Sequence, residues 1–251
     1  MKSLEVLFTP ADFAGLARRN LDDTVCVVFD VFRATSSMVT ALANGASAII
    51  PVAEIPEALA WRQKDPSVLL AGERDGVRIR AELTGAVDFD LGNSPREFTR
   101  ERVAGRTIVM STTNGTRALR ACAHAQRVLI SSFLNLRATA ERIHREGPEH
   151  LLLVCSGTFE QAALEDVLAA GALCDAGWPD QPEHDRSDAA RMARELYLQA
   201  KPDLAAAASS SRNGRRLLAR PELAEDVAFC LRVDATPCVA CLGDDGKVRL
   251  Q

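Results

Sequence analysis

The residues best suited to chemistry lie in the stretch Thr24–Ser36, TVCVVFDVFRATS. A run of β-branched and apolar residues ends abruptly at Asp30, and Arg33 and small hydroxyl residues follow before a predicted helix. A buried strand that brings a carboxylate, a guanidinium and a helix N-terminus to one edge of a sheet is suited to hold a metal ion or an oxyanion. Helix capping is the plainer alternative for Asp30 alone.

A second candidate loop is the segment 71–76, AGERDG, which follows an apolar strand. Its Glu73 offers another hard oxygen ligand for a divalent cation, and Arg74 stands beside it. A solvated turn is the alternative for this segment.

A third loop is the segment 91–98, LGNSPREF, in which Asn93 and Ser94 precede Pro95 and Arg96. Pro95 fits the first position of a helical turn, with Ser94 as its cap. An ordinary helix start explains the serine and the proline, but it explains the adjacent Asn93 and Arg96 less well.

The strongest local signal is the segment 111–119, STTNGTRAL, which follows a predicted strand and enters a helix. Backbone N–H groups and hydroxyls at a helix N-terminus, with Arg117 in the first turn, form a cradle for an anion. The GxxxxGK[ST] spacing of a nucleotide-binding loop is absent, and a plain N-cap is the alternative. The residues expected to bind substrate here are Ser111, Thr112, Thr113, Asn114 and Gly115.

The segment 154–173 adds an acidic pair, Glu165 and Asp166, which apolar residues surround on nearly every side of a predicted helix. Because a buried carboxylate without a compensating group is very unfavourable, at least one of the pair is expected to face a metal ion or an arginine. A cysteine-dependent phosphatase needs an arginine six residues after its nucleophile; Cys155 has Gln161 there instead. The basic segment 209–217, SSSRNGRRL, either caps the site or forms a solvated turn.

The elements that must position these residues follow one plan. An apolar strand, a polar turn and an alanine-rich helix recur at 25–44, 108–125 and 151–174. Alternation of strands and helices predicts an α/β fold whose largely parallel sheet is covered on both faces. Right-handed crossovers then place the three turns at the same edge of the sheet. The irregular stretch 74–105 is typical of a functional loop.

The length of 251 residues is enough for a full core in one or two domains. We expect a single domain over 1–251, with a helical subdomain over 178–235 left open. The polar segment 178–188 is predicted to be a surface loop, and helices are expected near 189–199, 202–209 and 222–231. The segments 238–242 and 247–250 predict a hairpin.

Composition excludes several classes of protein. A net charge of −4 and 5% aromatic residues argue against a nucleic-acid partner. No apolar run approaches a membrane span, and the N-terminus lacks the pattern of a signal peptide, so a cytoplasmic location is expected. Seven cysteines do not suggest a disulfide framework, and the lone pair Cys238 and Cys241 is weak evidence for zinc.

Taken together and in this order, DVFRATS, AGERDG, LGNSPREF, STTNGTRAL and LEDVLAAGAL resemble the 2-phosphosulfolactate phosphatase family (ComB-like proteins), over about residues 4–235. The resemblance implies a three-layer α/β/α fold with a largely parallel or mixed central sheet and a helical C-terminal part. It also implies a Mg²⁺-dependent phosphoric monoester hydrolase that converts 2-phospho-3-sulfolactate to 3-sulfolactate and phosphate. That reaction belongs to coenzyme M biosynthesis in methanogens, and bacterial members occur where this pathway is not evident.

With this resemblance, each motif receives a role. Asp30, Arg33, Glu73 and Arg117 are the expected catalytic residues, and Asp30, Glu73, Glu165 and Asp166 are the candidate Mg²⁺ ligands. Fixed positive charge is expected from the arginines, and the turn at 111–116 is expected to cradle a phosphate or sulfonate. Besides that turn, the residues expected to bind substrate are Arg74, Asn93, Ser94, Arg96, Ser156 and Thr158.

Two other functions stay open at this point. One is a Mg²⁺-dependent phosphohydrolase acting on another small phosphorylated acid, and the other is a non-catalytic anion-binding protein with the same fold. We expect direct attack by water, with a covalent route through Asp30, Ser111 or another residue as the alternative. The expected partner is a small anionic phosphorylated sulfonate, with no nucleic acid or membrane, and assembly into a homo-oligomer is left open.

Overall fold

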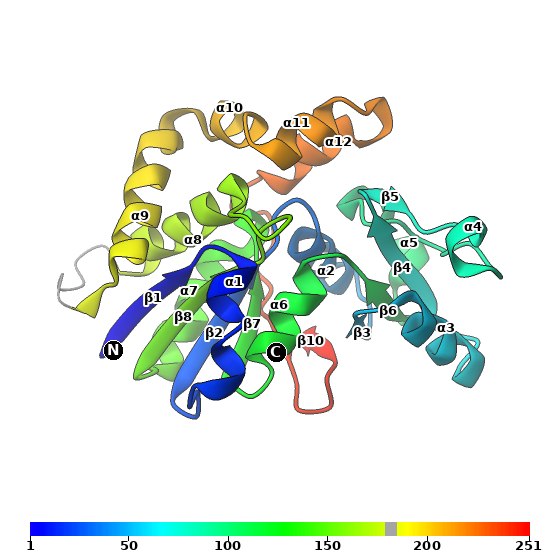
Figure 1. The fold of residues 1–251 in the computed structure, drawn as a ribbon, viewed down its shortest axis with the longest axis horizontal. Coiled ribbons are helices and arrows are strands. Elements are labelled where there is room, and N and C mark those ends of the chain that lie inside the picture. The colour runs from blue at the N-terminus through cyan, green and yellow to red at the C-terminus, as the bar shows by residue number, and fades with distance from the viewer. Residues whose placement is uncertain (179–184) are drawn as a thin grey trace.

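The computed structural model describes residues 1–178 and 185–251. These residues form one ten-stranded sheet in the order β1-β8-β2-β7-β9-β10-β3-β6-β4-β5 (Figure 1). The strands are β1 Ser3–Leu7, β2 Thr24–Phe29, β3 Ala48–Val52, β4 Leu69–Arg74, β5 Val77–Arg78, β6 Thr107–Ser111, β7 Arg127–Ser131, β8 His150–Cys155, β9 Ala240–Leu242 and β10 Val248–Leu250.

Helices connect most of these strands. The α-helices are α1 Pro10–Phe13, α2 Ala34–Ala43, α3 Ile55–Lys64, α4 Ala81–Thr84, α5 Arg100–Val103, α6 Gly115–Cys122, α7 Leu136–Glu146, α8 Leu164–Gly177, α9 Asp188–Ala200, α10 Leu204–Ser209, α11 Arg212–Leu218 and α12 Pro221–Cys230. Short 3₁₀ helices are η1 Leu16–Arg18, η2 Pro95–Glu97, η3 Phe133–Asn135 and η5 Lys201–Asp203.

Strand β2 shows why helices cover both faces of the sheet. Its side chains alternate, so that Val27 and Phe29 pack in one apolar cluster while Cys26 and Val28 pack in another. The first cluster includes side chains of α7, α8 and α9, and the second includes side chains of α1, α2 and α6. The sheet is therefore the middle of three layers (Figure 1), which confirms the predicted α/β/α architecture.

The sheet has two parallel parts joined by the C-terminal hairpin. Strands β1, β8, β2 and β7 run parallel in one part, and β3, β6 and β4 run parallel in the other. Strand β9 pairs antiparallel with β7, and β10 pairs antiparallel with β3. The hairpin predicted at 238–250 thus fills the gap between the two parts and makes the sheet continuous.

Helices α10, α11 and α12 lie above one edge of the sheet (Figure 1). They form the helical C-terminal part that the motifs predicted. The expected surface loop at 178–188 falls largely on residues 179–184, which lie outside the described residues.

Helix α8 begins at Leu164, directly before the acidic pair Glu165 and Asp166. The residues before it form a tight turn, in which Thr158 and Gln161 exchange backbone hydrogen bonds of 2.8 and 3.1 Å. Phe159 and Glu160 have φ angles of 51° and 59°. Two successive residues in the left-handed region cannot continue a right-handed helix, which is why α8 starts only after this turn.

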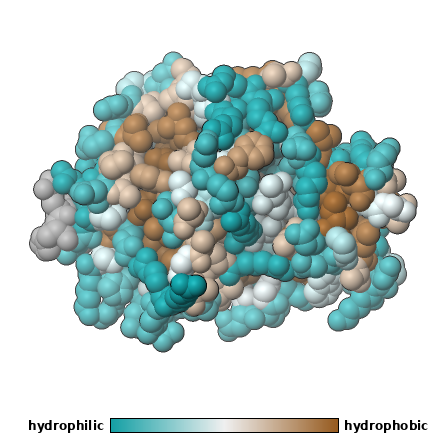
Figure 2. All heavy atoms as spheres, viewed as in Figure 1, coloured by the Kyte–Doolittle hydropathy of each residue, from teal (hydrophilic) through white to brown (hydrophobic). Residues whose placement is uncertain are grey.

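The face shown in Figure 2 is mostly hydrophilic. Figure 2 shows hydrophobic residues in separate patches on the visible face rather than in one continuous area. No helix within 1–178 and 185–251 is long and apolar enough to cross a membrane.

Candidate functional site

A pocket lies where polar residues follow strands β2, β4 and β6, beneath helices α11 and α12. The sheet side contributes Asp30, Glu73, Asn93, Thr113 and Asn114, and the helical side contributes Asn213, Arg216, Leu217, Arg220 and Leu223. Phe32, Arg33, Asp75, Gly76, Thr158 and Phe159 complete the lining. Segments far apart in the sequence therefore meet at one edge of the sheet.

Asp30 is held at the end of β2 by the helices that follow β2 and β6. Its Oδ1 accepts a hydrogen bond of 3.1 Å from the backbone N–H of Ala34 in the first turn of α2. A Cβ at Gly115, the first residue of α6, would lie 2.9 Å from Asp30 Oδ2, so only glycine permits this close approach. Asp30 thus sits between the positive ends of two helices.

Burial nevertheless raises the pKa of Asp30 to about 7. The hydrogen bond from Ala34 lowers the pKa, but the negative charges of Glu73 and Glu165 raise it further. Near neutral pH, a carboxyl group with this pKa either keeps its proton or has its charged form stabilised by a cation in the pocket.

Glu73 is fixed by three hydrogen bonds. Its Oε1 accepts from the backbone N–H and from the hydroxyl of Thr113, each at 2.9 Å, and its Oε2 accepts from the backbone N–H of Gly76 at 2.7 Å. The turn at 111–116 was predicted to cradle an anion from the substrate. In the structure its donors at Thr113 hold one of the protein's own carboxylates.

The acidic pair on α8 lies outside the pocket: burial raises the pKa of Glu165, while hydrogen bonds and the charge of Arg212 lower it. Asp166 accepts from the backbone N–H groups of Val31, at 2.8 Å, and Gly157, at 3.2 Å. These bonds tie the loops after β2 and β8 together and compensate the burial of the carboxylate. Glu165 Oε1 accepts from Asn213 Nδ2 at 2.6 Å. Neither residue lines the pocket. Burial raises the pKa of Asp166 well above its usual range, and the neighbouring charges of Glu165 and Asp30 raise it further.

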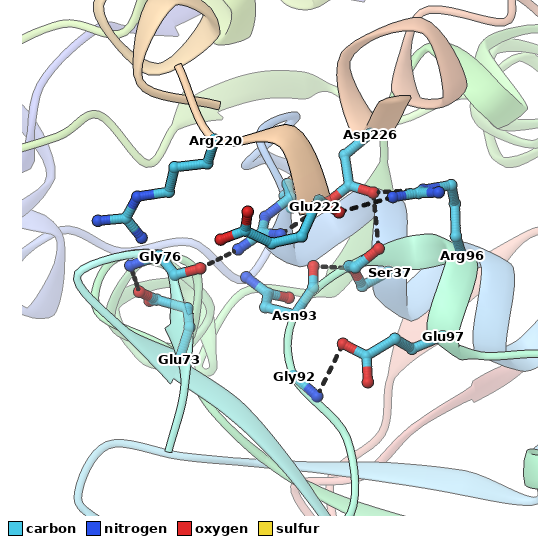
Figure 3. Close-up of polar contacts among 12 residues, drawn as sticks. Ser37, Glu73, Gly76, Gly92, Asn93, Arg96, Glu97, Arg220, Glu222 and Asp226 are labelled. Carbon is cyan, nitrogen blue, oxygen red and sulfur yellow. Dashed lines mark hydrogen bonds and ion pairs between the residues drawn. The ribbon is translucent and has the colours of Figure 1, made fainter. Parts of the chain in front are cut away.

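Arg33 is buried and paired with Asp226, a residue that sequence reasoning missed. Its Nη1 donates to Asp226 Oδ2 at 2.7 Å, and its Nη2 donates to the carbonyl oxygen of Gly76 at 2.6 Å. Asp226 Oδ1 also accepts from Ser94 Oγ at 2.6 Å and from Arg96 Nε at 2.8 Å. Figure 3 shows Asp226 on its helix facing Arg96, with Asn93 nearby.

The other predicted arginines lie outside the pocket. Arg74 is bound to Ser111 Oγ, at 2.9 Å, and to nearby carbonyl oxygens, and Arg117 pairs with Glu160. Both line an adjacent groove with Thr112. Arg96 and Ser94 line a second adjacent pocket on the other side of Arg33. The predicted residues that do share the pocket are Asp30, Arg33, Glu73, Asn93, Thr113, Asn114 and Thr158.

Three predicted residues have buried side-chain oxygens with no hydrogen-bond partner in the described chain. They are Asn93 Oδ1, Thr112 Oγ1 and Ser156 Oγ. Only Asn93 lines the pocket that contains Asp30 and Glu73. A buried acceptor without a partner needs an explanation, and in a pocket a bound water, cation or ligand supplies one.

Helix α11 contains functional candidates that the sequence indicated only weakly. The segment 209–217 was predicted either to cap the site or to form a solvated turn, and the structure places its Asn213, Arg216 and Leu217 over the pocket. Its basic composition was the available signal. Nothing in the sequence pointed to Asp226 or Arg220.

The oxygen donors of the pocket fit a magnesium ion by their chemistry. Asp30, Glu73 and the unpartnered Asn93 Oδ1 are the hard oxygen ligands that Mg²⁺ prefers. Within residues 1–178 and 185–251, no three His, Cys, Asp or Glu side chains form a group that could hold a metal ion. Water and substrate oxygens would have to complete the coordination, as is usual for Mg²⁺.

Comparison with known proteins gives a consistent result. The family model for 2-phosphosulpholactate phosphatase matches residues 13–245. A probable 2-phosphosulfolactate phosphatase of Caldicellulosiruptor saccharolyticus is 39% identical over 87% of this chain and 89% of its own length. Another, from Pseudothermotoga lettingae, is 36% identical over 98% of both chains. A third, from Thermotoga maritima, is 37% identical over 86% of this chain and 88% of its own length.

These matches extend over nearly the whole chain and include all of the elements that form the pocket. The chain therefore belongs to the 2-phosphosulpholactate phosphatase family, a family of phosphoric monoester hydrolases, as its motifs predicted.

Proposed function

We propose that this protein is a Mg²⁺-dependent phosphatase that hydrolyses 2-phospho-3-sulfolactate to 3-sulfolactate and phosphate. The observation that carries the proposal is the meeting of Asp30, Glu73 and Asn93 in one pocket with arginines on the facing helices, in a chain of this family. A substrate with a phosphate, a carboxylate and a sulfonate needs both a cation near the acidic residues and further positive charge around it.

Mg²⁺ would be held by Asp30, Glu73 and Asn93 Oδ1. When bound, the ion offsets the charge of the phosphoryl group and orients the groups that react. The chain contributes the arrangement of its own oxygens: Glu73 is fixed by Thr113 and Gly76, and Asp30 by Ala34. The raised pKa of Asp30 means that burial disfavours its charge, so cation binding and proton release are linked.

Direct attack by water is the route we favour. Ser111 is a poor nucleophile candidate because its hydroxyl is buried, donates to the carbonyl oxygen of Ala53 at 3.2 Å and accepts from Arg74 at 2.9 Å. Asp30 is then the residue for a covalent alternative. Hydrolysis of a substrate with a chiral, isotopically labelled phosphoryl group separates the two routes: direct attack gives inversion at phosphorus, and a phosphoaspartate gives retention.

The activity is tested by phosphate release from synthetic 2-phospho-3-sulfolactate after removal of metal with EDTA. We expect no release without metal and recovery on addition of MgCl₂, with CaCl₂ as the control for divalent charge alone. Release that is unaffected by EDTA would overturn the role of Mg²⁺. A panel of other small phosphorylated acids tests the substrate, and a larger kcat/KM on any of them would reassign it.

A non-catalytic anion-binding role gives a different result. In that case Asp30→Asn and Glu73→Gln would leave the affinity for 2-phospho-3-sulfolactate almost unchanged, and wild-type protein would release no phosphate. Isothermal titration calorimetry with the substrate, with and without MgCl₂, measures that affinity.

A further inference from the structure

Three arginines line the pocket, and one of them has no polar partner in the part of the chain that the structure describes. Arg33 is paired with Asp226, and Arg220 Nη1 donates to the carbonyl oxygen of Asp75 at 3.2 Å. Arg216 makes no hydrogen bond or ion pair within the described chain, and its guanidinium lies 5.4 Å from the centre of the Phe159 ring. A guanidinium that lies over an aromatic ring still has N–H groups to donate to a ligand.

The position of Arg216 is fixed by the helix that carries it. Three residues earlier on α11, Asn213 Nδ2 donates to Glu165 Oε1 at 2.6 Å and to Thr158 Oγ1 at 2.8 Å. Residues three apart lie on the same face of a helix, so these bonds turn the face with Arg216 toward the pocket. The neighbouring Arg215 does not line the pocket and instead donates to the carbonyl oxygen of Ser210.

We propose that Arg216 binds an anionic group of the substrate that is not transferred, either its sulfonate or its carboxylate, and that it thereby determines specificity. This inference rests on the proposed function. The acidic residues and Asn93 lie on the sheet side of the pocket, where the phosphoryl group and Mg²⁺ belong, and Arg216 lies on the helical side. Arg220, from the turn after α11, extends toward Gly76 (Figure 3) and adds positive charge to the pocket.

The test compares three substrates in wild type and in Arg216→Gln. They are 2-phospho-3-sulfolactate, phospholactate, which lacks the sulfonate, and 2-phosphooxyethanesulfonate, which lacks the carboxylate. We expect Arg216→Gln to lower kcat/KM for the full substrate about 10- to 100-fold, the range of a charge-assisted hydrogen bond. The loss should be much smaller for the analogue without the group that Arg216 binds.

The control is Arg215→Gln, which removes the same charge from the same helix outside the pocket. It should leave kcat/KM unchanged for all three substrates. Arg216→Lys should recover part of the loss, because lysine keeps the charge but lacks the bidentate fork. An equal loss on all three substrates, or no loss on any, overturns the proposal, and thermal unfolding of Arg216→Gln shows whether the fold is intact.

A binding measurement separates this proposal from the proposed function. Calorimetry with 3-sulfolactate and with lactate, the product and its analogue without sulfonate, needs no catalysis. In one outcome, wild type binds 3-sulfolactate and Arg216→Gln binds it more weakly, but no substrate releases phosphate. The phosphatase assignment then fails, and the role of Arg216 stands. If wild type is active and Arg216→Gln binds 3-sulfolactate and all three substrates as wild type does, the role of Arg216 fails alone.

Discussion

The two sides of the pocket are built in different ways. On the sheet side, the carboxylate floor, formed by Asp30 and Glu73, is held chiefly by backbone N–H groups of Ala34, Thr113 and Gly76. On the helical side, the arginine cover, formed by α11 and α12, is held by side chains. Its contacts include Asn213 with Glu165 and Thr158, and Asp226 with Arg33, Ser94 and Arg96.

This difference indicates which side of the pocket can be substituted without disturbing the sheet. Groups fixed by the backbone stay in place as long as the sheet is formed, so the floor is suited to chemistry that requires fixed geometry. Groups fixed by side chains can be altered one at a time without disturbing the sheet, so the cover is suited to selecting the substrate. Substitutions in the floor should therefore abolish turnover, and substitutions in the cover should change stability and affinity.

The largest effect is expected for Asp30→Asn. This substitution keeps the shape of the side chain and removes the charge, so kcat should fall by about three orders of magnitude, the scale seen for groups that act on the transition state. Thermal unfolding should show a fold at least as stable as wild type, because burial disfavours the carboxylate. The control is Asp22→Asn, an exposed residue before the same strand. More than a tenth of wild-type activity in Asp30→Asn would remove Asp30 from the catalytic machinery.

The floor was largely predictable because each of its residues lies at the end of an apolar strand. Asp30 follows β2 directly, and Glu73 lies near the end of β4. Arg74 was predicted to lie at the same site because it stands beside Glu73 in the candidate loop 71–76. In the structure β4 continues to Arg74, so successive side chains point to opposite faces, and Arg74 turns away from Glu73 to Ser111.

Arg117 shows a similar limit of sequence reasoning. The pattern placed it in the first turn of α6, which is correct, but a helix turns by about 100° per residue, so neighbours in the first turn face different directions. Arg117 faces solvent and pairs with Glu160. Carboxylates already lie at the start of α6, because Glu73 accepts from the backbone N–H of Thr113 and Asp30 lies against Gly115.

The sequence indicated the cover only through the basic segment 209–217, and the contacts of the cover were not predictable because they link distant positions. Arg33 and Asp226 are 193 residues apart in the chain. No spacing rule connects them, and Asp226 stands in an ordinary helical pattern, PELAEDVAFC. The C-terminal hairpin was recognised from its turn, but its place between β7 and β3 depends on pairing with strands more than a hundred residues earlier.

The next largest effect is expected for Asp226→Asn, which breaks the contact between floor and cover. Asp226 and Arg33 are 0% and 3% exposed, so the substitution leaves a buried guanidinium without its counter-charge. The free energy of unfolding should fall by about 3 kcal/mol, as for other buried ion pairs that lose one partner. Denaturant titration measures the loss, and kcat/KM should fall as well.

The matched control for Asp226 is Glu225→Gln. Glu225 pairs with Arg96, which also contacts Asp226, but its side chain is 77% exposed. An exposed ion pair contributes about 0–1 kcal/mol, so this substitution should change stability little. Similar losses in the two variants would mean that burial of Asp226 does not set the strength of the contact.

A smaller effect is expected from pH. The pKa of Asp30 is raised to about 7 in the folded protein, so its contribution to stability is present at low pH and is lost as pH rises through 7. Metal binding needs the deprotonated carboxylate. MgCl₂ should therefore raise Tm more at pH 8 than at pH 5.5, and Asp30→Asn should abolish the difference. Scanning fluorimetry at both pH values, with NaCl of equal ionic strength as control, measures it, and an equal shift at both would separate Asp30 from the ion.

The smallest effect is expected for Asn213→Ala, which loosens the cover without touching the floor. The substitution removes two hydrogen bonds, to Glu165 and Thr158, that set the face of α11 turned toward the pocket. Net contributions of about 1 kcal/mol per bond imply a several-fold rise in KM. Because Asp30 and Glu73 keep their backbone donors, kcat should change by less than about twofold. Steady-state kinetics, with Arg215→Ala as the control, shows whether kcat or KM changes. A fall in kcat with KM unchanged would mean that the cover takes part in the chemical step together with the floor.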